Sequence, residues 1–205
     1  MDILNRTDIP EDLRECIMFH GHLCPGLIYG FLVSKEALRL LGLNRAQDEE
    51  LVAVCENDSC SVDALQVVLG TTAGKGNLIV KNYGKNAYTV ISRKTEKAYR
   101  FSRKRSYAYQ GEDKDAFEVL EKAVVSGTAT KEQKKRQKLL KAMDLLAKPF
   151  SVIFETSEAE FVMPDYAETA PSKACETCGE MTMASRMKQK NGKDLCVPCF
   201  ERLDK

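Results

Sequence analysis

The sequence lacks long apolar runs and has almost no excess of charge. None of its 205 residues belongs to an apolar stretch that approaches the ~20 residues needed to span a bilayer. The first residues show no basic-then-apolar signal pattern, so we expect a cytoplasmic protein with no membrane segment. The formal net charge of +1 argues against a protein that mainly binds nucleic acid, although the basic, tyrosine-containing segment 93–109 leaves local binding open.

Histidine is scarce, and cysteine is unevenly distributed. The chain has 2 histidines and 8 cysteines, of which Cys16, Cys24, Cys55 and Cys60 lie in the first third and the other four follow residue 174. In a reducing compartment, such cysteines are metal ligands, reactive thiols or packing residues more often than disulfides. A hydrophobic content of 43% supports a folded core around them.

The predicted elements indicate an α+β fold with a mixed β-sheet flanked by helices. Apolar spacing, caps and turns predict the division into helices and strands. We expect a core domain over 1–165, a linker near 164–173 and a zinc-finger domain over 171–205. The predicted helices cover 9–19, 25–42, 60–69, 114–125 and 130–148, and the predicted strands cover 51–55, 78–82, 87–92, 98–102 and 150–154.

The last segment has the spacing of a four-cysteine zinc site. Two Cys-x-x-Cys pairs are separated by 17 residues, within the range of about 15–20 that is typical of such sites. Some thirty residues bury too little apolar surface to fold unaided, and a tetrahedral zinc supplies the missing stability. With a hairpin at Asn191-Gly192 and a helix after it, the pattern predicts a treble-clef finger. The predicted ligands of this structural zinc are Cys175, Cys178, Cys196 and Cys199.

Both histidines lie next to a cysteine, in the order His20-x-His22-x-Cys24. Imidazole and thiolate both bind zinc and neighbouring transition metals, and a cysteine at a helix N-terminus is favoured as thiolate. A polar loop beside a packed cysteine would give the same pattern. From these residues alone, both interpretations stay open.

Three segments together resemble the FmdE-like family, which is named after formylmethanofuran dehydrogenase: 19–26 (FHGHLCPG), 60–66 (CSVDALQ) and 74–78 (GKGNL). The resemblance covers about residues 15–155. It implies a thioredoxin-like α+β core, usually dimeric, whose motif residues line a metal-binding active site. The implied metal ligands are His20, His22 and Cys60, for zinc or another divalent transition metal. The implied neighbours are Cys24, Glu56, Asp63 and Lys75.

The resemblance also implies catalytic roles and one departure. If the protein is an enzyme, Cys24 would be a nucleophile, Cys60 a metal ligand in the active site and Lys75 an anchor for an anion. Thr71 stands where the family commonly has a cysteine. Cys55 could replace that thiol, although its place in a predicted strand favours packing equally. The spacing around Gly70 and Gly74 does not fit a nucleotide-binding P-loop.

Two functions therefore follow from the sequence. The first is an FmdE-like metal-binding protein, either an accessory subunit or a small metalloenzyme linked to formylmethanofuran dehydrogenase and one-carbon metabolism. The second is a zinc-finger adaptor or regulator that binds protein or nucleic acid, with the core as a dimerisation scaffold. The chain is too short to hold a molybdopterin domain as well, so the first function implies docking to a larger enzyme complex. Whether the protein is itself an enzyme stays open.

Overall fold

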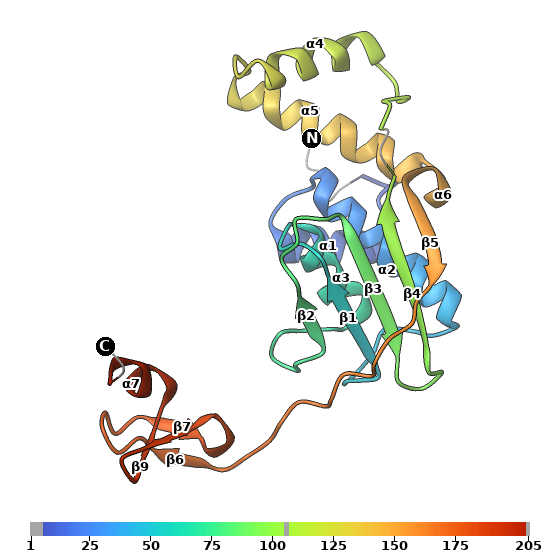
Figure 1. The fold of residues 1–205 in the computed structure, drawn as a ribbon. Helices are drawn as coiled ribbons and strands as arrows, with labels where there is room; N and C mark the ends of the chain where they lie inside the picture. The colour runs from blue at the N-terminus through green and yellow to red at the C-terminus, as the bar shows by residue number, and fades with distance from the viewer. Residues whose placement is uncertain (1–5, 105–106, 204–205) are drawn as a thin grey trace. The chain divides into compact units, whose positions relative to one another are not determined.

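Figure 1 shows the computed structural model, which describes residues 6–104 and 107–203. The chain separates into two compact units, Met1–Tyr166 and Ala167–Lys205. In the described residues, none of the helices is both long and apolar enough to cross a membrane. The first unit contains α1 (Glu11–His20), α2 (Pro25–Leu41), β1 (Leu51–Cys55), α3 (Ser61–Leu69), β2 (Leu78–Val80), β3 (Ala87–Ser92), β4 (Lys97–Arg103), α4 (Lys114–Val125), α5 (Lys131–Ala147), α6 (Phe150–Ile153) and β5 (Phe154–Glu158).

The first unit is built on a five-stranded mixed sheet in the order β2-β1-β3-β4-β5. β1 and β2 are parallel, and α3 connects them, because parallel neighbours need a crossover rather than a hairpin. The other neighbours are antiparallel. The mixed α+β architecture is confirmed, and the finer description as thioredoxin-like stays a prediction.

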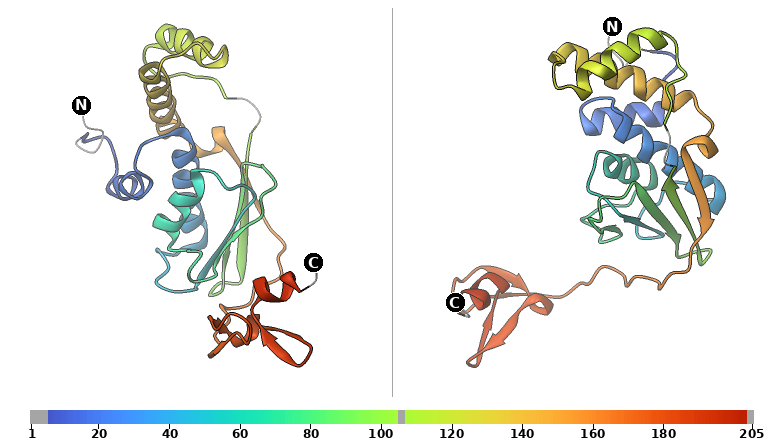
Figure 2. Two further views of the ribbon diagram at one scale, coloured as in Figure 1. Left: turned by 90° about the vertical axis from the view of Figure 1, so that its left-hand side faces the viewer. Right: turned by 45° about the horizontal axis from the view of Figure 1, so that its top comes forward.

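Helices α1, α2 and α3 cover one face of the sheet, as Figure 2 shows. The main core lies between these layers, where Tyr88, Phe101 and Phe154 are fully buried against α2. The opposite face has a smaller apolar cluster around Val52 and Ile91. Residues 159–163, which follow β5, supply its cover through Ala159, Phe161 and Met163. The chain between the units therefore begins as part of the first unit.

The helical hairpin of α4 and α5 agrees closely with its prediction. The observed helix over Lys114–Val125 has the predicted bounds. Thr130 and Gln133 form the predicted capping box at the start of α5, in which each side chain bonds the other residue's backbone N–H. Its amphipathic spacing packs α5 against both α4 and α2.

The predicted strand over 150–154 is wrong. These residues form α6, a single helical turn that begins after Pro149, and the strand β5 starts only at Phe154. Proline fixes φ near −58° at Pro149, which suits the start of a helix. The real strand was missed because four of its five residues are polar and exposed, as suits a sheet edge. β2 is also shorter than predicted and ends at Val80.

The second unit consists of two small hairpins and a helix. It contains β6 (Ser172–Ala174), β7 (Met181–Met183), a 3₁₀ turn (Ala184–Arg186), β8 (Lys188–Lys190), β9 (Lys193–Leu195) and α7 (Val197–Arg202). Asn191 and Gly192 both have positive φ and make the predicted turn between β8 and β9. Its buried core holds Leu195 and three cysteines. So small a core leaves most of the folding free energy to a bound ion.

Candidate metal centres

The four C-terminal cysteines form one cluster. Cys175 and Cys178 come from the turn between β6 and β7, whereas Cys196 precedes α7 and Cys199 lies in its first turn. Their ligand atoms lie within 4.8 Å of one another. The Sγ atoms of Cys178 and Cys196 are 3.8 Å apart. This matches the edge of a tetrahedron with Zn–S bonds of about 2.3 Å, so the donors fit a zinc ion without rearrangement.

The electrostatics of this cluster also favour a cation. Backbone N–H groups, that of Cys178 first and that of Cys196 next, lower the pKa of the Cys175 thiol to about 6. The neighbouring thiol of Cys196 is the largest cause that raises the pKa of Cys199 to about 12. Four sulfurs in contact cannot all ionise unless a positive charge lies between them. A bound zinc supplies that charge, and four thiolate ligands complete its shell.

Two helix ends and one helix start create a second cluster in the core. α1 ends at His20, and Gly21 turns the chain away with a φ of 89°. Cys24 caps the start of α2, and its sulfur accepts the backbone N–H of Leu27 at 3.5 Å. Cys60 occupies the same position before α3. The loop after α1 therefore lies beside the starts of two helices.

Two glycines of α2 allow these helices to approach closely. A Cβ atom on Gly30 would lie 2.0 Å from the carbonyl oxygen of Ser61, and one on Gly26 would lie 3.0 Å from the Cβ of Cys60. Only a residue without a side chain fits at Gly30, because the atom it would meet belongs to the backbone of α3. This contact brings Cys60 to Cys24.

His20, Cys24 and Cys60 have donor atoms within 4.8 Å of one another. The Nε2 atom of His20 is 3.7 Å from the Sγ of Cys24, close to the separation of about 3.5 Å across a tetrahedral zinc site. The other ring nitrogen, Nδ1, lies 2.7 Å from the Oδ2 of Asp63. A carboxylate behind a histidine fixes the ring's orientation and tautomer and leaves Nε2 to bind a metal. The donor set fits zinc, with one coordination position left for water or another ligand.

The structure replaces His22 with Cys24 in this set. The His22 side chain is exposed and lies against the His20 ring, with ring centroids 4.5 Å apart. Its ligand atoms do not join the group formed by His20, Cys24 and Cys60. Burial, followed by the charges of His20 and Lys138, lowers the pKa of His22. His20 rather than His22 lies at the helix end that contacts α3, a distinction that the loop sequence alone does not reveal.

Cys24 is therefore placed as a ligand rather than as a free nucleophile. Burial is the largest cause that raises the pKa of its thiol, and the nearby Cys60 adds to the effect. Without a cation, the Cys24 sulfur is thus protonated at neutral pH and is a poor nucleophile. The signal for a ligand was present in the sequence, since Cys24 follows His20 by four residues and precedes a proline that opens a helix.

Lys75 and Thr71 lie at the opposite end of the sheet from Cys60. The loop that holds both residues leads into β2, whose parallel pairing with β1 places it beside the start of β1, whereas Cys60 follows the end of β1. The α3 helix separates the two ends by roughly 15 Å. Lys75 donates to the carbonyl oxygens of Gln47 and Asp48, so it anchors a loop and not an anion at the core cluster. The absent family thiol at Thr71 likewise takes nothing from this cluster.

Two further predicted neighbours have structural roles. Glu56 accepts hydrogen bonds from the guanidinium of Arg100, the shorter at 2.8 Å, and so pairs with β4. Cys55 is fully buried in β1, and burial raises the pKa of its thiol to about 12. Such a thiol stays protonated and packs as a small apolar side chain. Of the predicted neighbours, Asp63 and Cys24 contact the core histidine.

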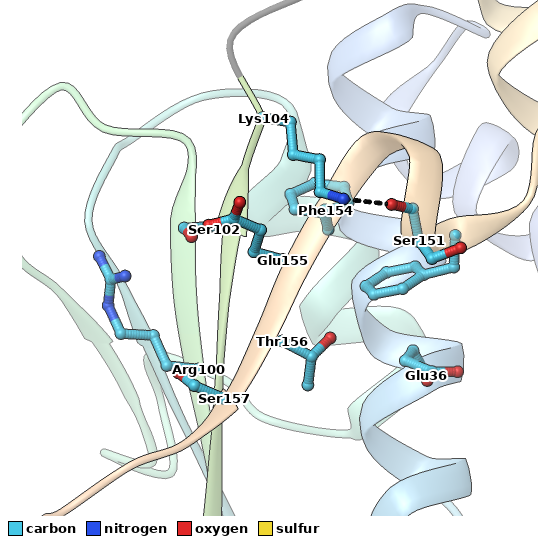
Figure 3. Close-up of a pocket in the computed structure, with 10 residues that line it drawn as sticks. Glu36, Arg100, Ser102, Lys104, Ser151, Phe154, Glu155, Thr156 and Ser157 are labelled. Atoms are coloured by element: carbon cyan, nitrogen blue, oxygen red, sulfur yellow. Dashed lines mark hydrogen bonds between the residues drawn. The ribbon is translucent and has the colours of Figure 1, made fainter.

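A large open cavity of about 760 Å³ lies along the edge strand β5, next to β4 and α6 (Figure 3). Hydroxyl groups and charged side chains line it, among them Ser102, Thr156 and Glu155. Its two cations are already engaged, because Arg100 pairs with Glu56 and Lys104 donates to the carbonyl oxygen of Ser151. Neither cysteine cluster contributes to its lining, so we do not place the functional site there.

Two family models match the chain. The one described as "FmdE, Molybdenum formylmethanofuran dehydrogenase operon" matches residues 19–160. The prokaryotic dksA/traR C4-type zinc-finger model matches residues 168–205. The first contains the core cluster and the second contains all four C-terminal cysteines, so each match coincides with one cysteine cluster.

Two known proteins are similar to the chain. A probable S-adenosyl-L-methionine-binding protein of Archaeoglobus fulgidus is 33% identical over 189 residues, which cover 88% of this chain and 50% of that protein. The chain thus spans about half the length of this curated relative. The crystal structure of an FmdE-like protein of tungsten formylmethanofuran dehydrogenase from Syntrophus aciditrophicus has a TM-score of 0.56 and 20% identity, over 97% of this chain and 95% of that one. At this identity the likeness shows the fold.

Proposed function

Since the chain belongs to the FmdE family, with a C4-type zinc finger after its core, we propose that it is a protein with two metal sites. The finger holds a structural zinc on Cys175, Cys178, Cys196 and Cys199. The core holds zinc or another divalent transition metal on His20, Cys24 and Cys60. The observation that carries the core site is the approach of His20 to Cys24 while Asp63 holds its other nitrogen.

The two sites differ in what they leave open. Four thiolates saturate a tetrahedral zinc, so the finger has a structural role. Three protein ligands at the core leave a position for water or a substrate oxygen, which a metal can polarise or activate. His20, Cys24 and Cys60 hold the ion, and Asp63 accepts the proton on the Nδ1 of His20 and orients the ring.

The link to formylmethanofuran dehydrogenase and one-carbon metabolism comes from the family name. We propose an accessory subunit or a small metalloenzyme of that metabolism, docked to a larger enzyme complex and located in the cytoplasm. The name of the Archaeoglobus relative is not adopted, because half of that protein lies outside the match. The thioredoxin-like description of the core belongs to the same proposal and has the support of the mixed sheet order.

A homodimer is part of this proposal. Its support is the helical hairpin, where Val119 and Val125 of α4 are 64% and 80% exposed. Apolar side chains at this exposure are candidates for cover by a second copy. Sedimentation velocity of the full chain should give twice the monomer mass, and Val125→Glu should shift it toward the monomer. A monomer at all concentrations would remove the dimer from the proposal.

Metal analysis of matched histidine variants tests the core site. Protein purified with zinc should hold about two ions per chain, since each cluster fits one tetrahedral ion. His20→Ala should lower the count to about one, whereas His22→Ala should leave it near two, because His22 lies outside the donor group. Retention of two ions by His20→Ala would contradict the proposed core site. A Cys175→Ser variant should lose the finger's ion alone.

A further inference from the structure

A second, smaller cavity of about 140 Å³ lies in the first unit, between α2, the end of β4 and α6. Three of its lining side chains are cations, and the described lining contains no acid. The remaining lining is aromatic, aliphatic or amide. The lining residues are Tyr29, Arg103, Lys104, Tyr107, Ala108, Gln110, Lys148, Val152 and Ile153.

Arg103 and Tyr29 present unused hydrogen-bond donors to this cavity. The guanidinium of Arg103 lies over the Tyr29 ring at 4.9 Å from its centroid. In the described part of the chain, no carboxylate or carbonyl accepts a hydrogen bond from the Arg103 side chain. The Tyr29 side chain is only 6% exposed, and its hydroxyl likewise bonds to none of the described residues. A buried hydroxyl and a buried-edge guanidinium without acceptors point to an acceptor from outside the chain.

The other two cations are partly engaged but keep the cavity positive. Lys104 donates to the carbonyl oxygen of Ser151 at 2.7 Å, an uncharged acceptor. Lys148 pairs with Asp144 at 2.6 Å. Asp144 also accepts the Tyr107 hydroxyl and the backbone N–H of Gln110, so its carboxylate is saturated from behind the lining. Three positive charges against one committed negative charge leave a net attraction for an anion.

We propose that this cavity binds a short-chain monocarboxylate. A guanidinium binds a carboxylate through two parallel hydrogen bonds, and the Tyr29 hydroxyl adds a third donor. The cavity's about 140 Å³ equals four to five water volumes of about 30 Å³, room for an acid of about four carbons. Val152 and Ile153 give the hydrocarbon end an apolar wall, which a phosphate ion would leave unused. None of the metal ligands lines the cavity, so this site is independent of the proposed core metal.

Titration calorimetry of the full zinc-loaded chain with butyrate and, separately, with inorganic phosphate tests this site. We expect butyrate to bind with a Kd on the order of millimolar, as suits a ligand with few atoms. Arg103→Gln should weaken binding on the order of tenfold or more, because it removes the charge-assisted pair. Tyr29→Phe, which keeps the ring and removes the hydroxyl, should weaken it by about threefold or more. Lys97→Gln removes an exposed cation at the other end of β4 and is the matched control, with no expected change.

The possible outcomes separate clearly. Butyrate binding that depends on Arg103 and Tyr29 but not on Lys97 supports the site. An equal loss in Lys97→Gln would show non-specific attraction and overturn it, as would the absence of butyrate binding to the unaltered chain. Phosphate binding in place of butyrate would overturn the assignment to carboxylates. Far-ultraviolet circular dichroism confirms folding of Arg103→Gln, and Tyr29→Phe gives an independent test if that variant is unfolded.

Discussion

The two cysteine clusters place metal ligands in opposite structural contexts. In the finger, four sulfurs converge where the buried core is little more than Leu195 and the cysteines themselves, so the ion has to supply the folding free energy. In the core, His20, Cys24 and Cys60 converge because helices α1, α2 and α3 already pack against a sheet. The ion shapes the protein in the first case, and the protein shapes the site in the second. A ready-made site can leave a coordination position open.

Removal of metal should separate the two clusters most strongly. A chelator should unfold the finger, because structural zinc contributes roughly 10–16 kcal/mol to the folding of such modules. The sheet and helices of the first unit should stay folded, since their core holds no ion. Limited proteolysis would then cut within 172–203 and spare 11–103. Protection of the finger after complete chelation would contradict the account.

Acid should weaken the core site over a wide range. The pKa of Cys24 is raised by burial, so metal binding must displace its proton, and the affinity falls as pH falls. Each displaced proton weakens binding about tenfold per pH unit below the pKa. Zinc titrations of Cys175→Ser protein between pH 6 and 9 isolate the core site. His22→Ala should leave the slope unchanged, and a profile independent of pH would argue against thiolate ligands.

Gly30→Ala should destabilise the first unit by about 3 kcal/mol or more. The added Cβ would lie 2.0 Å from the Ser61 carbonyl oxygen, which belongs to the backbone of α3 and has no rotamer to change. Separation of the helices should also weaken core metal binding. Gly74→Ala is the matched control, since a Cβ there meets nothing within 4 Å. Urea denaturation of the two variants measures the difference, and equal stabilities would show that α2 and α3 do not need this close contact.

Asp63→Asn should lower the affinity of the core for zinc by about 10- to 100-fold and leave the finger intact. Asparagine keeps the shape of the side chain but loses the charge that holds the His20 ring. Asp115→Asn, on exposed α4, is a control for the charge change. Competition with a zinc indicator gives both affinities. An unchanged core affinity in Asp63→Asn would separate the carboxylate from the metal site.

The sequence predicts most where local chemistry decides the structure. The spacing of the finger cysteines, the helix over 114–125 and the apolar strand β1 all follow from contacts near in sequence. The errors concern relations that depend on topology. Lys75 is near Cys60 in the sequence motifs, but the parallel pairing of β1 and β2 places it at the other end of the sheet. The polar edge strand β5 has too little apolar alternation to be recognised before its partner β4 is known.

The choice between His20 and His22 has the same origin. Both residues flank Gly21, and only the close packing of α2 on α3 determines which imidazole reaches the sulfur of Cys24. Motif resemblance therefore locates the core site to within a loop, and the helix contacts select its ligands.

A crystal of the full zinc-loaded chain, measured on both sides of the zinc absorption edge, tests the central claim most directly. We predict two anomalous peaks per chain, one among the finger cysteines and one bonded to the Nε2 of His20 and the sulfurs of Cys24 and Cys60. A single peak at the finger, with the core cluster closed around its own hydrogen bonds, would contradict the account.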